Sequence, residues 1–139
     1  MNVVITGATK GMGYAMAEAF AAEGANLALT ARTATDLIQV KETIARKFPR
    51  TQIICVPADL ARPNDIGAFA QKIKDTWDRV DVLINNAGLF YTGDMMKENE
   101  DNLEQMMAVN LFGPVKLTRS LSPLIFQAEK PHVFNICSV

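Results

Sequence analysis

The chain has 139 residues, 49% of them hydrophobic and 21% charged, which suits one globular domain with a sizeable core. Fourteen Lys and Arg oppose fifteen Asp and Glu, so the formal net charge of −1 gives no sign of a nucleic-acid partner or an anionic membrane surface. With one histidine and two cysteines, we expect neither a metal centre nor a disulfide framework.

From the sequence we expect neither a signal peptide nor a membrane-spanning segment. Residues 2–6 already form a strand-like run with no signal-peptide pattern before it, and the apolar runs are too short to cross a bilayer. Cys55 and Cys137 both lie in apolar runs and are expected to be core thiols of a reduced compartment. These features predict a cytoplasmic protein with no membrane partner.

Short apolar runs alternate with helical periodicity along the whole chain. In chain order, we expect a strand at residues 2–6, a helix at 11–23, a strand at 27–30, a helix carrying Leu37, Val40, Ile44 and Phe48, a strand at 52–56, a helix that starts at Pro63 and carries Trp77 on its apolar face, a strand at 80–84, a polar loop at 89–99, a long helix from about Glu100 to Phe126, and a strand at 132–136. Gly24 and Pro49 stand where the first two helices should end.

This alternation predicts an α/β fold with a doubly wound, Rossmann-like parallel sheet. The strands are continuous apolar runs, as in sheets covered by helices on both faces. Right-handed crossovers give the strand order 3-2-1-4-5, with ligand bound at the carboxyl ends of the first and fourth strands. Residues 1–139 are thus predicted to form a dinucleotide-binding domain, incomplete at its C-terminus because it stops after the fifth strand.

A glycine-rich turn lies between the first strand and the first helix. Gly7 permits a sharp turn, while Gly11 and Gly13 remove side chains where backbone approaches a pyrophosphate or where the helix packs on the sheet. The free N–H groups and dipole of the helix start would face the phosphates. Such a turn can also serve packing alone and bind nothing.

Four motifs in register resemble the short-chain dehydrogenase/reductase family. They are Thr6-Gly7-x-x-x-Gly11-x-Gly13, Asn85-Asn86-Ala87-Gly88, Asn110 within Val-Asn-Leu, and Ser138 after Asn-Ile-Cys. The resemblance implies an oxidoreductase that moves hydride between nicotinamide and a small carbonyl or alcohol substrate. It also implies a homo-oligomer, since the long helix usually packs against its counterpart in another subunit.

The cofactor is predicted to be NADP(H). An NAD-preferring domain usually has Asp or Glu at the end of the second strand, whereas this chain has Ala31 followed by Arg32. Arg32 offers a planar fork to a 2′-phosphate, and Lys10 adds a second positive charge. The alternative is that both are ordinary solvated cations. The cofactor-binding residues we assign are Gly7, Thr9, Lys10, Gly11, Met12, Gly13, Arg32, Asp59, Leu60, Asn86, Ala87 and Gly88.

Two of these groups rest on the resemblance. It places Asp59 and Leu60 at the adenine, where Asp59 would accept from the exocyclic amine; the alternative is that Asp59 caps the helix begun at Pro63. Asn86 and Gly88 are expected to contact or closely approach the cofactor's ribose. For Asn85, a purely structural role and direct contact are equally compatible with the sequence.

The resemblance implies a catalytic tetrad of Asn, Ser, Tyr and Lys, of which Asn110 and Ser138 match the first two. Pro114 has no N–H to bond the Asn110 carbonyl, so that carbonyl is expected to be free near a kink and able to hold a water. A solvent-side kink without function is the alternative, and Ser138 could be only a turn former.

The remaining two members of the tetrad find no match in these 139 residues. The family's Tyr-x-x-x-Lys would follow Ser138 by about a dozen residues, while Tyr14 and Tyr91 have no lysine four positions on. We therefore expect the chain by itself to lack turnover. Two descriptions stay open: an NADP(H)-dependent oxidoreductase in the full-length parent, or a cofactor-binding or structural fragment.

Overall fold

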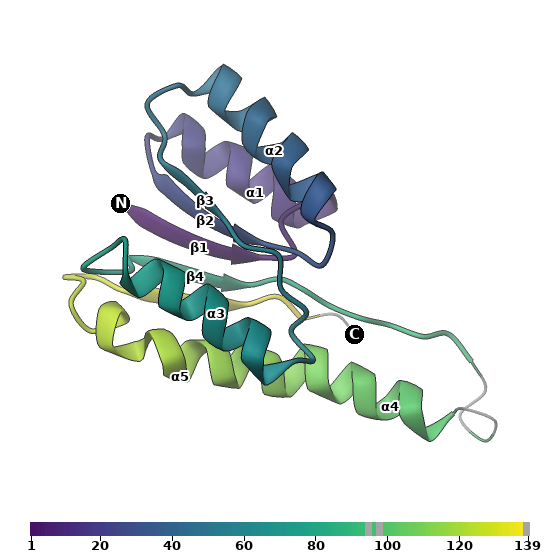
Figure 1. Cartoon of the computed structure of the whole chain (residues 1–139). Coiled ribbons are helices and arrows are strands. Elements are labelled where there is room, and N and C mark those ends of the chain that lie inside the picture. Colours follow the sequence, from purple (N-terminus) through teal and green to yellow (C-terminus); the bar gives the residue numbers. More distant parts are fainter. Residues whose placement is uncertain (94–95, 97–98, 138–139) are drawn as a thin grey trace.

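The computed structural model describes residues 1–93, 96 and 99–137, and within them it contains a five-stranded parallel sheet in the order β3-β2-β1-β4-β5 (Figure 1). The strands are β1 (Asn2–Thr6), β2 (Asn26–Thr30), β3 (Ile53–Cys55), β4 (Val82–Asn85) and β5 (His132–Asn135). The predicted doubly wound fold and its strand order are confirmed.

Helices cover both faces of this sheet (Figure 1). Helices α1 (Gly11–Ala22) and α2 (Ala34–Lys47) lie on one face, and α3 (Pro63–Lys74) and α5 (Gly113–Ile125) lie on the other. Side chains alternate between the faces, as the period of a strand requires: Val3 and Ile5 join the core under α1 and α2, whereas Val4 joins the core under α3 and α5. All three are fully buried.

The long helix expected from about Glu100 to Phe126 has three parts. Helix α4 (Glu100–Met107) continues into a π-helical turn, η2 (Ala108–Phe112), and then into α5. The N–H of Gly113 donates to the carbonyl of Ala108, five residues back, which is the π-helical spacing. The irregularity expected around Pro114 therefore takes the form of a wider helical turn.

Gly113 also brings this helix close to the loop after β3. A Cβ at Gly113 would lie 2.9 Å from the carbonyl oxygen of Leu60 and 3.0 Å from the Leu60 Cβ. Such a contact is too short for any side chain, so only glycine permits this approach. The π-helical turn and the Leu60 loop are thereby held against each other, next to the carboxyl end of the sheet.

The outermost strand departs from the expected packing. All four residues of β5 are exposed, and so is Cys137 just beyond it. The prediction that Cys137 is a core thiol is therefore wrong: among the described residues, β5 pairs only with β4 and lies at the border of the sheet. Cys55, on the opposite border strand, is partly buried beside Leu37.

Candidate functional site

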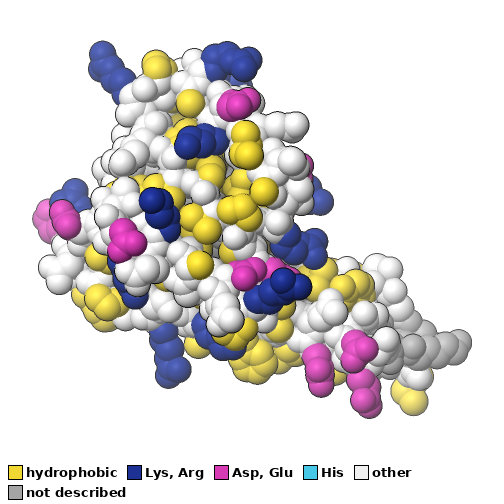
Figure 2. Space-filling view, viewed as in Figure 1, with side chains coloured by type: hydrophobic (Ala, Val, Ile, Leu, Met, Phe, Trp, Pro, Cys, Tyr) yellow, Lys and Arg dark blue, Asp and Glu magenta, His cyan; other side chains and the backbone are white. Residues whose placement is uncertain are grey.

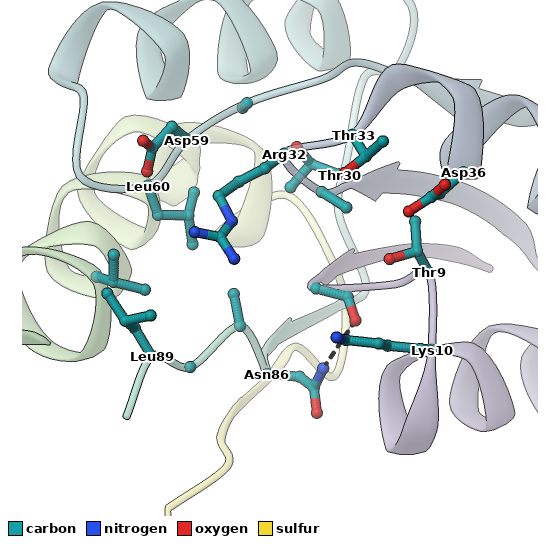
Figure 3. A pocket seen from close by; sticks show the side chains of 16 residues that line it. Thr9, Lys10, Thr30, Arg32, Thr33, Asp36, Asp59, Leu60, Asn86 and Leu89 are labelled. Atoms are coloured by element: carbon teal, nitrogen blue, oxygen red, sulfur yellow. Dashed lines mark hydrogen bonds between the residues drawn. The ribbon is translucent and has the colours of Figure 1, made fainter. Parts of the chain in front are cut away.

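An open cleft of about 300 Å³ lies at the carboxyl ends of β1, β2 and β4 (Figure 3). Strands β1 and β4 are neighbours in space but not in sequence, so the connections from β1 and from β4 leave in opposite directions. The residues that line the cleft are Gly7, Thr9, Lys10, Thr30, Ala31, Arg32, Thr33, Asp36, Ala58, Asp59, Leu60, Asn86, Ala87, Gly88, Leu89 and Val109. The sequence predicted a ligand at this position.

The glycine turn is shaped by contacts within the protein. Gly7 and Gly11 have φ values of 66° and 55°, in the left-handed region that favours glycine. A Cβ at Gly13 would lie 2.2 Å from the Gly7 carbonyl oxygen and 2.6 Å from Nδ2 of Asn86. Gly13 therefore lets helix α1 start directly against the turn.

Six residues of the turn were assigned to the cofactor, and the structure divides them. Gly7, Thr9 and Lys10 line the cleft. Gly11, Met12 and Gly13 are not among its lining residues, and the Met12 side chain is exposed. For Gly13 the structure supports the packing part of the expectation, since the close approach is to the turn itself.

Hydrogen bonds tie the ends of β1 and β4 together. The buried Thr6 hydroxyl accepts from the backbone N–H groups of Asn86 and Ala87, both at 3.0 Å. In return, Nδ2 of Asn86 donates to the carbonyl oxygens of Thr6 at 3.0 Å and Gly7 at 3.2 Å. The floor of the cleft is therefore fixed by backbone and side-chain bonds between segments about 80 residues apart.

Asn85 faces away from this cleft. It is buried, and its Nδ2 donates to Oδ1 of Asn135 at 2.9 Å and to the hydroxyl of Thr118 at 3.3 Å. Its Oδ1 has no partner among the described residues. These contacts join β4 to β5 and α5, and they favour the structural alternative for Asn85 over direct cofactor contact.

The positive charges of the cleft lining come from Arg32 and Lys10. Both side chains are exposed, and Figure 3 shows each of them extending into the cleft from its wall. Neither takes part in an ion pair among the residues that the structure describes. Ala31, where an NAD-preferring domain would carry a carboxylate, also lines the cleft. Two unpaired cations therefore stand where the sequence placed a 2′-phosphate.

An acidic side chain that the sequence interpretation missed also lines the cleft. Asp36 lies in the first turn of α2 and points toward Thr9 (Figure 3). The sequence Thr33-Ala-Thr-Asp36 matches a helix-capping pattern, which explains why it attracted no functional interpretation. In the structure, the Thr33 side chain makes no capping hydrogen bond.

Asp59 and Leu60 line the side of the cleft toward which Arg32 extends (Figure 3). Oδ1 of Asp59 accepts from the N–H of Ala61 at 3.0 Å, and its Oδ2 is 3.8 Å from Nε of Arg62. Helix α3 has Arg62 at its N-cap position, with no side-chain capping bond. Asp59 therefore braces its own loop, and the alternative that it caps this helix is wrong.

Asn110 occupies the π-helical turn and clamps the loop after β4. Its Oδ1 accepts from the backbone N–H of Leu89, and its Nδ2 donates to the Leu89 carbonyl, both at 2.8 Å. The sequence pointed to the main-chain carbonyl of Asn110 and gave no signal for this side-chain role, because Leu89 is 21 residues away in the chain. Ser138, the other predicted catalytic residue, lies outside the described residues.

Two features are absent from residues 1–93, 96 and 99–137. No group of three or more His, Cys, Asp or Glu side chains there is arranged to hold a metal ion. In the same ranges, no helix combines the length and the apolar character needed to cross a bilayer.

The fold and the cleft at the reversal of strand order define the Rossmann-type class of doubly wound α/β proteins. A family model described as short chain dehydrogenase matches residues 1–139, and the chain belongs to that family. The resemblance carried by the four motifs is thereby confirmed.

Individual relatives agree with this assignment. The chain is 40% identical over 141 residues to dehydrogenase/reductase SDR family member 7B of Bos taurus, covering 99% of this chain and 43% of that protein. A metagenomic short-chain oxidoreductase solved with NADP superposes with a TM-score of 0.91 at 32% identity, covering 100% of this chain and 62% of the other.

L-sorbose reductase from Gluconobacter frateurii, solved with NADPH and L-sorbose, gives a TM-score of 0.90 at 28% identity, over 95% of this chain and 50% of that one. The chain thus spans about half the length of the relatives it matches.

Proposed function

We propose that the chain binds NADP(H) and forms the nucleotide-binding part of an oxidoreductase that moves hydride between nicotinamide and a carbonyl or alcohol substrate. The observation that carries the proposal is a pair of cations, Arg32 and Lys10, which form no ion pair with the described residues and line a cleft where Ala31 follows β2. The solved relatives that contain NADP or NADPH support the same cofactor.

The residues of the cleft fit such a cofactor. The guanidinium of Arg32 would hold the 2′-phosphate in a bidentate manner, with Lys10 as a second positive charge. The N–H groups at the start of α1 would favour the pyrophosphate, and Asp59 with Leu60 would border the adenine. When bound, the nicotinamide supplies the hydride chemistry.

Asn110 and Ser138 are the residues of this chain that we assign to the reacting end. Asn110 holds the backbone of Leu89, which lines the cleft, and its main-chain carbonyl is proposed to hold a water. Ser138 is proposed to hold the substrate oxygen. A small carbonyl or alcohol is the proposed substrate class.

The decisive test is the affinity for NADPH against NADH. Arg32→Ala removes the fork that would meet the 2′-phosphate, so NADPH binding should weaken by about 1–3 kcal/mol while NADH binding stays nearly unchanged. Calorimetry measures both affinities. The matched control is Arg50→Ala, since Arg50 is an exposed arginine outside the cleft. Wild-type protein that binds NADH as tightly as NADPH would contradict the proposal.

A second candidate function is cofactor binding without turnover by these 139 residues. It is favoured by the absence of any Tyr-x-x-x-Lys in the chain. A missing general acid typically costs about 10²–10⁴-fold in rate. Purified 139-residue chain, with its mass verified, should bind NADPH but fail to oxidise it with a panel of ketones and aldehydes. Steady NADPH oxidation with any of them would reject this candidate and require another acid.

We also propose self-association through the exposed apolar side chains of the long helix, namely Leu103, Met107, Leu111, Phe112 and Val115. Helix α4 has no buried residue and projects from the body of the molecule, where Figure 2 shows acidic side chains gathered beside apolar ones. Burial of such a surface is a common basis of dimers. Sedimentation should show a dimer that Leu111→Glu dissociates and that Ile38→Glu, on exposed α2 surface, leaves intact.

A further inference from the structure

The cleft that Arg32 and Lys10 line also contains a carboxylate, that of Asp36. Asp36 lines the cleft together with Thr9, Lys10 and Arg32, and Figure 3 shows its side chain directed toward Thr9. Its carboxylate has neither a hydrogen bond nor an ion pair among the described residues. The Asp36 carboxylate is therefore available to a ligand that enters the cleft.

The other acidic residue of the lining, Asp59, differs from Asp36 in its position and in the bonds of its carboxylate. Asp59 stands at the opposite end of the cleft, where its carboxylate accepts from the Ala61 N–H and lies near Arg62. Its charge is therefore partly compensated within its own loop. Among the described residues Asp36 forms no ion pair, and the positive end of the α2 dipole favours its charge.

Resting on the proposed NADP(H) binding, we propose that Asp36 is a specificity-determining residue that opposes the cofactor's 2′-phosphate and so limits the preference for NADP(H) over NAD(H). A 2′-phosphate held by Arg32 and Lys10 would lie in the part of the cleft that Asp36 also borders. Two like charges there repel each other, whereas a neutral 2′-hydroxyl meets no such repulsion. The two cations supply the preference, and Asp36 sets how large it becomes.

This arrangement has a chemical consequence for the reaction cycle. Because the oxidised and reduced cofactors carry the same 2′-phosphate, the repulsion from Asp36 weakens both equally. It therefore lowers the affinity for the spent cofactor as much as the affinity for the fresh one. Discrimination between NADPH and NADH is the property that isolates Asp36 from any general effect on the fold.

The test is Asp36→Asn, which keeps the shape of the side chain and removes its charge. We expect NADPH to bind about 3- to 10-fold more tightly at low salt and NADH to be unchanged, with the NADPH gain shrinking as salt screens the charge. The simpler probes 2′,5′-ADP and 5′-AMP should repeat this contrast. The matched control is Glu42→Gln, which removes one negative charge from the same helix outside the cleft and should change neither affinity.

Each other result has a definite meaning. Equal gains for NADPH in Asp36→Asn and Glu42→Gln would overturn the proposal in favour of a general charge effect. Weaker NADH binding with unchanged NADPH would overturn it in favour of a hydrogen bond from a ribose hydroxyl to Asp36. If Asp36→Asn left both cofactor affinities unchanged while Arg32→Ala lost the preference for NADPH over NADH, this inference would be overturned and the proposed function would stand. Wild-type protein that binds neither cofactor would overturn both.

Discussion

Strands β1 and β5 belong to one sheet, yet their surroundings are opposite. In β1, the residues from Val3 to Thr6 are completely buried, with parallel neighbours on both edges and helices on both faces. In β5, every residue is exposed, and among the described residues only its edge beside β4 is paired. Both strands contain adjacent apolar residues, so the difference in burial follows from the neighbouring strands and helices that cover β1 and not β5 among the described residues.

The walls of the proposed cofactor site belong to the buried part of the sheet. The walls that would hold the phosphates and the adenine come from the ends of β1, β2 and β3 and from the loop after β4, all anchored in buried strands. By contrast, β5 at the border of the sheet is exposed. The nucleotide-binding part should therefore be stable and preorganised, while the β5 side contributes little to stability.

The largest expected effect contrasts two phenylalanines. Phe69 of α3 is fully buried, whereas Phe134 of β5 is 47% exposed and stacks on His132. Phe69→Ala should lower the free energy of unfolding by about 3–5 kcal/mol, because it loses burial and leaves a cavity. Phe134→Ala should cost less than about 1 kcal/mol. Urea unfolding followed by circular dichroism measures both, and similar costs would contradict the comparison.

Much of the buried part could be predicted from the sequence. Continuous apolar runs separated by helical periods identify parallel strands, and right-handed crossovers leave few strand orders. The ends of β1, β2 and β4 meet at one edge for that reason, so Gly7, Arg32 and Asn86 could be assigned to one site before their contacts were known. The path of the main chain places these three residues at one edge of the sheet.

The exceptions are side-chain contacts between distant segments. The clamp of Asn110 on Leu89 depends on the π-helical turn, whose register no local pattern reveals. The place of Asp36 in the cleft depends on how α2 is oriented above β2, while its sequence pattern matches an ordinary helix cap. Cys137 has the neighbours of a core residue in sequence, but the border of the sheet leaves it exposed.

The second prediction tests how tightly the buried part is built. In Gly13→Ala, the new methyl group would meet the Gly7 carbonyl oxygen at 2.2 Å, so the turn and α1 must move apart. We expect a loss of about 1–3 kcal/mol in stability, typical of overpacking, together with weaker NADPH binding. Urea unfolding measures the change in stability, and calorimetry measures the change in NADPH affinity.

Gly67→Ala provides the matched control. Gly67 lies within α3, and a Cβ there meets no atom within 4 Å. Alanine is the better helix former, so this variant should gain roughly 0.5–1 kcal/mol and bind NADPH as the wild type does. If Gly13→Ala behaved like Gly67→Ala, the close contact at the turn would not exist.

The third prediction compares the two thiols on the two border strands. Burial raises the pKa of Cys55 from its usual 9.0 to about 11, with Lys41 acting weakly in the opposite direction. Cys137 is exposed. Because the thiolate is the reactive form, at pH 8 Cys55 should react with iodoacetamide at least about 100-fold more slowly than Cys137.

The same shift makes stability depend on pH in a defined direction. The folded-state pKa of Cys55 exceeds its unfolded value, so the protonated thiol's contribution is fully present below about pH 9 and is lost as the pH rises through about 11. Wild-type protein should therefore lose stability over that window relative to Cys55→Ala, whereas Cys137→Ala should follow the wild type. Urea unfolding at several pH values measures this difference. Rapid labelling of Cys55 in folded protein, or parallel pH profiles for wild type and Cys55→Ala, would show that the β3 border is as open as the β5 border.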